Sequence, residues 1–73
     1  MSTYLVVLEE GPTSYGAYSP DVPGCFAVGS TTEEALQRFQ EALQSHMELL
    51  REEGEEVPLP TAQSATVDIL VPA

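Results

Sequence analysis

The chain has one cysteine and one histidine, the side chains that pair as nucleophile and base in cysteine hydrolases. Such a pair requires Cys25 and His46 in contact, with the thiol activated as a thiolate. His46 instead falls between Leu43 and Leu50 in an apolar helical pattern, and Cys25 opens a hydrophobic run in a very acidic chain. We therefore interpret Cys25 as a small buried hydrophobic residue, place His46 at the margin of the core, and predict no enzymatic activity.

The residue types also give little basis for a metal or cofactor site. A structural zinc site takes four Cys or His ligands, and the chain has two such residues in all. A two-metal nuclease needs carboxylates that converge within a few ångströms. Glu9, Asp21 and Asp68 lie on or near different predicted strands and leave this alternative open. We expect no cofactor and no bound metal.

The charge balance limits the classes of partner. Two Arg and no Lys stand against twelve Asp and Glu, which gives a formal net charge of −10. Binding to nucleic acid draws most of its affinity from Lys and Arg, so we expect neither nucleic acid nor an anionic membrane as a partner. A cationic protein is favoured, although the same charge also keeps a small protein in solution. Without a signal-peptide pattern or a long apolar run, we expect a soluble cytoplasmic protein.

The positions of these side chains depend on four predicted strands. Residues 3–8 and 14–19, separated by a Gly-Pro turn, predict an antiparallel hairpin, and residues 25–29 predict a third strand. Residues 65–71, rich in Val and Ile, predict a fourth strand that completes the sheet. Alternation places Tyr15 and Tyr18 on opposite faces of the second strand, so one of them can face a partner.

A long amphipathic helix is predicted between the third and fourth strands. Ser30 to Glu33 resembles a capping box with Ser30 as the N-cap, and Gly54 is placed to end the helix after about 23 residues. Apolar residues and one histidine recur at helical spacing along one side: Ala35, Leu36, Phe39, Ala42, Leu43, His46 and Leu50. The other side carries an acidic ridge: Glu34, Glu41, Glu48 and Glu52.

Together these elements predict one α+β domain over residues 1–73. We expect a three-stranded antiparallel meander, one long helix packed across it, and a fourth strand in the order β-β-β-α-β. A chain of this length has a thin core, and oligomerisation is a common remedy. We therefore expect a homodimer or a homotetramer.

Two runs of the sequence resemble HicB-type antitoxins. They are Ser-Pro-Asp-Val-Pro-Gly-Cys-Phe at residues 19–26 and Gly-Ser-Thr-Thr-Glu-Glu-Ala-Leu at residues 29–36, and the Gly- and Pro-containing stretch 53–60 is similar to the family's exit from the helix. The resemblance covers nearly the whole chain. It implies a degraded ribonuclease-H-like fold without nuclease activity. It also implies that the protein binds and silences a small basic RNA-cleaving toxin of the HicA type by occupying its RNA-binding surface.

The motif does not fix the residues that touch a toxin. We expect contacts from Tyr18 and Asp21 and from the helix carboxylates Glu34, Glu41 and Glu48. Many family members carry a C-terminal DNA-binding segment, which this sequence lacks after its last predicted strand, so we expect a stand-alone domain without direct DNA binding. Two alternatives are a stand-alone oligomeric module that binds a small ligand or an unrelated protein, and a remnant metal-dependent nuclease.

Overall fold

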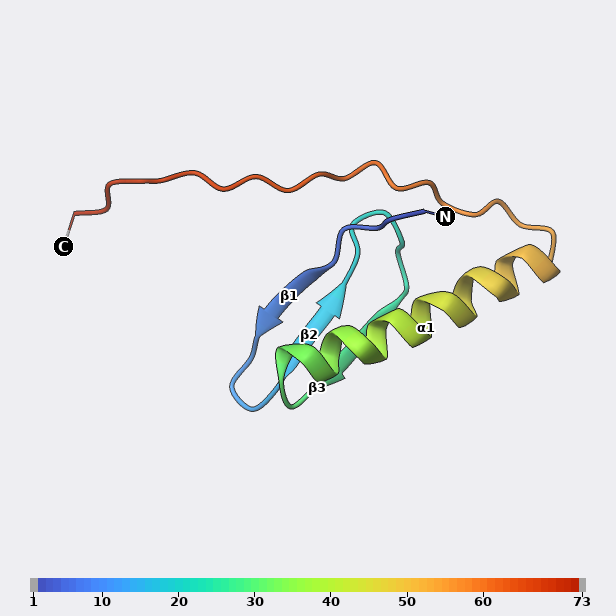
Figure 1. Ribbon diagram of the computed structural model, residues 1–73, viewed down its shortest axis with the longest axis horizontal. Helices are drawn as coiled ribbons and strands as arrows, with labels where there is room; N and C mark the ends of the chain where they lie inside the picture. Colours follow the sequence, from blue (N-terminus) through green and yellow to red (C-terminus); the bar gives the residue numbers. More distant parts are fainter. Residues whose placement is uncertain (1, 73) are drawn as a thin grey trace.

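Three short strands and one long helix form the folded part of the protein, which a computed structural model describes over residues 2–72 (Figure 1). The antiparallel strands β1 (Val7–Glu10), β2 (Tyr15–Tyr18) and β3 (Phe26–Gly29) form one sheet in the order β1-β2-β3. Helix α1 (Thr32–Glu52) follows. The predicted α+β meander and long helix are confirmed. The second and third strands and the helix are somewhat shorter than predicted, and the first strand, predicted over residues 3–8, begins at Val7 and continues to Glu10. Within these residues no helix is long and apolar enough to cross a membrane.

The strand register divides the sheet into two unlike faces. Ala17 pairs with Leu8 on β1 and with Ala27 on β3, and its side chain is fully buried beneath α1. The next residue, Tyr18, therefore points to the opposite face, together with its partner Phe26. Helix α1 packs mainly across β3 and β2 and reaches β1 only at its margin. One face of the sheet thus remains uncovered.

The hydrophobic core is small. Phe39 of α1 and Val22 of the loop between β2 and β3 are its largest fully buried side chains, and Ala17, Cys25 and Ala35 complete it. The prediction that Cys25 is a buried hydrophobic residue is confirmed. The Pro-rich loop therefore contributes to the core as well as connecting two strands.

The start of α1 lies one residue later than predicted. Thr31, rather than Ser30, is the N-cap, and its hydroxyl accepts the N–H of Glu34 at 3.1 Å. The Glu34 carboxylate in turn accepts the N–H of Ser30 at 2.9 Å. Ser30 and Thr31 can both cap a helix. Thr31 is the cap here because the carboxylate of Glu34, rather than that of Glu33, reaches back to the N–H that precedes the helix.

The end of α1 agrees with the prediction for Gly54. This glycine has a φ of 72°, and its N–H donates to the carbonyl of Arg51, while the N–H of Glu55 donates to that of Leu50. This pair of bonds is a Schellman motif, which satisfies carbonyl groups that the last helical turn leaves free. The glycine therefore turns the chain back toward the sheet.

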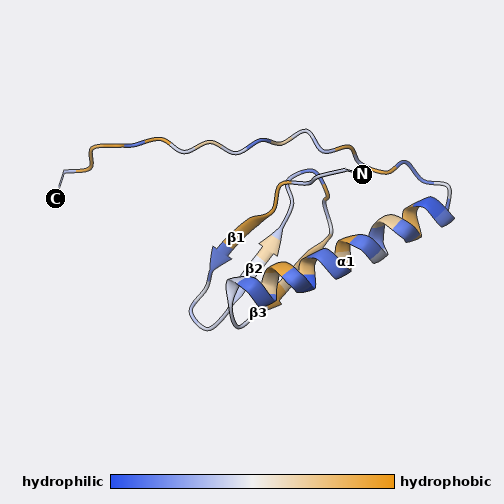
Figure 2. Ribbon diagram, in the orientation of Figure 1, coloured by the Kyte–Doolittle hydropathy of each residue, from blue (hydrophilic) through white to orange (hydrophobic). Residues whose placement is uncertain are grey.

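The predicted fourth strand is not formed within this chain. Residues 65–71 are extended but pair with no strand, and the tail runs from the end of α1 across one end of the sheet and past it (Figure 1). Its apolar residues are out of contact with the core (Figure 2), with Ile69 and Leu70 exposed by 74% and 97%. Strand propensity is insufficient here because a strand requires an edge to pair with. The ribonuclease-H-like relation stays a prediction.

Candidate functional site

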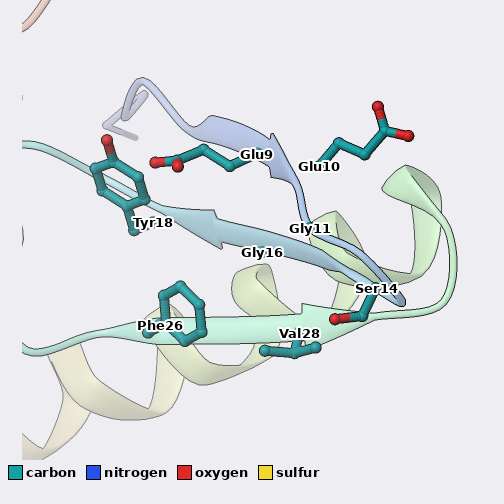
Figure 3. Close-up of a pocket in the computed structure, with 8 residues that line it drawn as sticks. All are labelled: Glu9, Glu10, Gly11, Ser14, Gly16, Tyr18, Phe26 and Val28. Atoms are coloured by element: carbon teal, nitrogen blue, oxygen red, sulfur yellow. The ribbon is translucent and has the colours of Figure 1, made fainter.

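The uncovered face of the sheet carries aromatic and acidic side chains (Figure 3). Phe26 and Tyr18 are neighbours across β3 and β2, and Phe26 is exposed by 60%. Together with Glu9 and Val28 they border a shallow depression of about 310 Å³. We call these four residues, Glu9, Tyr18, Phe26 and Val28, the aromatic–acidic face.

Gly16 determines how the Phe26 ring lies on this face. A Cβ atom at Gly16 would lie 3.0 Å from Cζ and 3.2 Å from Cε2 of Phe26. The missing side chain therefore lets the ring settle over the backbone of β2. The ring thus forms an exposed aromatic surface beside Tyr18.

Glu9 sets the chemistry of the neighbouring phenol. A hydrogen bond with Glu9, and after it the negative charge of the carboxylate, raises the pKa of Tyr18. The raised pKa keeps the Tyr18 hydroxyl in its protonated form, which donates hydrogen bonds, to higher pH than usual. Aromatic rings beside carboxylates suit Arg and Lys side chains, which stack on the ring and donate charge-assisted hydrogen bonds.

Asp21, expected to contact a partner, makes three hydrogen bonds within its own chain. Its Oδ2 accepts the N–H groups of Thr61 and Ala62, each at 2.9 Å, and its Oδ1 accepts the Thr61 hydroxyl at 2.7 Å. The N–H of Ala62, then the hydroxyl and N–H of Thr61, lower the pKa of Asp21. Asp21 therefore attaches the segment after α1 to the loop between β2 and β3.

The three helix carboxylates lie along α1, in the layer on the other side of the sheet from Tyr18. Glu34 is engaged in the helix cap and in an ion pair with Arg38 at 3.4 Å. Glu48 accepts a hydrogen bond from Gln44 at 3.0 Å, and Glu41 is exposed. The structure does not bring these residues together with Tyr18, and a contact of any of them with a partner stays a prediction.

The nucleophile and metal alternatives gain no support from the geometry. Burial raises the pKa of the Cys25 thiol, which disfavours the thiolate that a nucleophile requires. Across residues 2–72, no three His, Cys, Asp or Glu side chains lie close enough together to hold a metal ion.

Comparison with known proteins decides the family. Residues 4–69 match the family described as the HicB-like antitoxin of bacterial toxin–antitoxin systems. The chain belongs to the HicB-like antitoxin family. It is 33% identical to Antitoxin HicB 2 of Photorhabdus laumondii over 60 residues, which cover 82% of this chain and 43% of that protein.

Other similar proteins differ in length. A UPF0150 protein of Thermoplasma acidophilum is 34% identical over 65 residues, 88% of this chain and 94% of the relative. A 14.9 kDa protein of Haemophilus phage HP1 is 40% identical over 55 residues, 75% of this chain but 41% of the phage protein. The HicB-like chain thus spans less than half of two relatives and nearly all of another.

The HicB-like sequence motif has identifiable structural roles. Within it, Val22 and Cys25 fill the core, Gly24 adopts a φ of 85°, and Asp21 holds the segment after the helix. Sequence reasoning selected Tyr18, considered Glu9 only as a possible metal ligand, and missed Phe26. The alternation within residues 25–29 gave the signal, since it separates Phe26 and Val28 from the buried Gly29.

Proposed function

We propose that this HicB-like protein is an antitoxin that binds and neutralises a small basic RNA-cleaving toxin, without catalysing a reaction itself. The aromatic–acidic face is the observation that carries the proposal, together with membership of an antitoxin family. A net charge of −10 attracts a cationic toxin and accelerates its encounter with the chain. Covering the toxin's cationic surface would then prevent RNA from reaching it.

The aromatic–acidic face fits such a partner better than the acidic ridge of α1. Phe26 and Tyr18 offer aromatic side chains, the type of residue that often dominates interface energetics. Glu9 places a carboxylate beside the two rings, whereas Glu34 and Glu48 lie along α1, where no aromatic side chain of the sheet's uncovered face accompanies them. We therefore assign the central toxin contact to Phe26, Tyr18 and Glu9, and treat Glu41 as part of the surrounding charge.

The experiment is affinity capture of the tagged chain from its native host, followed by measurement of the affinity for the captured protein. We expect a small basic protein in near-stoichiometric amount. Phe26→Ala should weaken its binding about 30-fold, because truncating a central aromatic anchor costs about 2 kcal/mol. Leu49→Ala is the matched control, since Leu49 is an apolar residue of α1 that is exposed by 51%.

The variants also distinguish between the two acidic surfaces. Glu9→Gln should weaken binding, whereas Glu41→Gln should have little effect beyond the loss of one charge. Equal affinities for Phe26→Ala and Leu49→Ala, with a loss in Glu41→Gln, would move the contact to α1. Capture of no basic protein would contradict the antitoxin assignment itself.

A further inference from the structure

The tail after Ala62 is the largest part of the molecule that makes no contact with the core. The radius of gyration is 14.7 Å, whereas a compact domain of this length has about 11 Å. The accessible surface is 5893 Å², about 1,500 Å² more than the roughly 4,400 Å² typical of a compact monomer of this mass. An excess of this size equals the total area of a standard protein interface.

The tail has the residue pattern of a strand with one apolar face. In an extended segment, Val67, Ile69 and Val71 point to one side, while Asp68 and Leu70 point to the other. The three β-branched residues are exposed by 73–78% in this structure. Because the family match runs through residue 69, most of this segment lies within the matched family domain.

A groove of matching chemistry lies beside the open edge of the sheet. It has a volume of about 510 Å³ and lies between the segment that precedes β1 and helix α1. Its apolar lining is Tyr4, Val6, Leu36, Phe39, Leu43 and Met47. No charged residue lines it, although the chain has twelve Asp and Glu. An apolar strand therefore fits this groove, whereas a cationic partner does not.

The two edges of the sheet differ in their availability. On the β3 side, Arg38 of α1 donates a hydrogen bond to the carbonyl of Val28 at 3.0 Å. Within the described residues, β1 pairs only with β2, so its outer edge is free. A strand added there would lie beside the groove, and its inward side chains would enter it.

The chain's own tail leaves in a direction that takes it away from this edge. The hydrogen bonds from Thr61 and Ala62 to Asp21 fix the point of departure, and the tail then diverges from β1 (Figure 1). We propose that residues 65–71 add as a strand to the free β1 edge of a second copy. The same residues of the second copy add to the β1 edge of the first. Val67, Ile69 and Val71 then fill the partner's groove, and one interface, used twice, closes a symmetric dimer.

The first test is the mass of the purified chain by sedimentation equilibrium, without any toxin. We expect a dimer of twice 7.9 kDa. Ile69→Asp should weaken dimerisation by about 30-fold or more, because it places a carboxylate in an apolar groove. Leu70→Asp introduces the same charge at the neighbouring position on the other side of the strand, and should remain dimeric. A monomeric parent chain, or equal behaviour of the two variants, would overturn the proposal.

A second test separates exchange between copies from closure within one chain. Leu36→Cys and Ile69→Cys are made in separate chains, mixed, unfolded, refolded together and oxidised. Exchange predicts a disulfide-linked heterodimer between the two variants, while a tail that folds onto its own sheet gives none. A chain that is monomeric alone and orders its tail only on adding a basic protein would also contradict exchange. Because no toxin enters the first two measurements, their failure leaves the antitoxin proposal intact.

Discussion

At the scale of single residues, Asp21 illustrates how a motif residue can serve the fold. The sequence placed it in the Pro-Asp-Val-Pro-Gly loop, where a carboxylate looks available to a partner. The structure gives both of its oxygens to Thr61 and Ala62, some forty positions further along the chain. Such a contact was out of reach of sequence reasoning, because local spacing carries no information about which distant N–H groups will arrive.

Asp21 should make the attachment of this segment dependent on pH. Its pKa is lowered in the folded state, so the stability it contributes is present above the ordinary carboxyl pKa of about 3.9 and is lost as the pH falls through the lowered value. NMR should show the Thr61 and Ala62 amide signals titrating together with a midpoint below about 3.9. Asp21→Asn should abolish this titration. A midpoint at or above the ordinary value would contradict the hydrogen bonding described.

At the scale of elements, the junction between β3 and α1 fixes the position of the helix on the sheet. A Cβ atom at Gly29 would lie 2.4 Å from the backbone nitrogen of Ala35 and 2.9 Å from its Cα. Glycine is thus required here by close approach of two backbones. Ala35 and Phe39, which follow on α1, owe their full burial to this approach.

Gly29→Ala should therefore be strongly destabilising. Backbone atoms at this contact have to move, and overpacking of this kind costs about 3 kcal/mol, which lowers the melting temperature of a small domain by roughly 12 °C or more. Gly16→Ala is the matched control on the same sheet, because its new methyl meets the end of the exposed Phe26 side chain closely and the backbone, at Ala27, only at an ordinary contact distance of 3.9 Å. We expect that control to melt within a few degrees of the parent chain in a thermal scan followed by circular dichroism.

Helical periodicity and turn residues predicted the elements well, for reasons visible in the structure. The strand–strand–strand–helix order follows from local patterns, and Gly54 ends α1 because only its φ of 72° permits the Schellman motif at low cost. The predicted fourth strand is not formed, because the pairing of a strand depends on residues that lie far from it in the sequence. The Val- and Ile-rich pattern of residues 65–71 is real, but the pattern does not specify which edge, or which copy, accepts it.

At the scale of the whole molecule, the HicB-like chain has two surfaces of different composition. The aromatic–acidic face lies on the uncovered side of the sheet, and the apolar groove lies between the start of the chain and α1. The first suits a cationic protein, and the second suits the apolar strand of a second copy. The two surfaces do not overlap, so a dimer formed by strand exchange would leave both aromatic–acidic faces free for toxin.

The central claim is that this chain silences an RNA-cleaving toxin by stoichiometric binding. The most direct measurement is the rate at which the captured basic protein cleaves RNA as the purified chain is titrated in. We predict that cleavage stops near one chain per toxin and returns when Phe26→Ala replaces the parent chain at the same concentration. Undiminished cleavage at saturating parent chain would contradict the account.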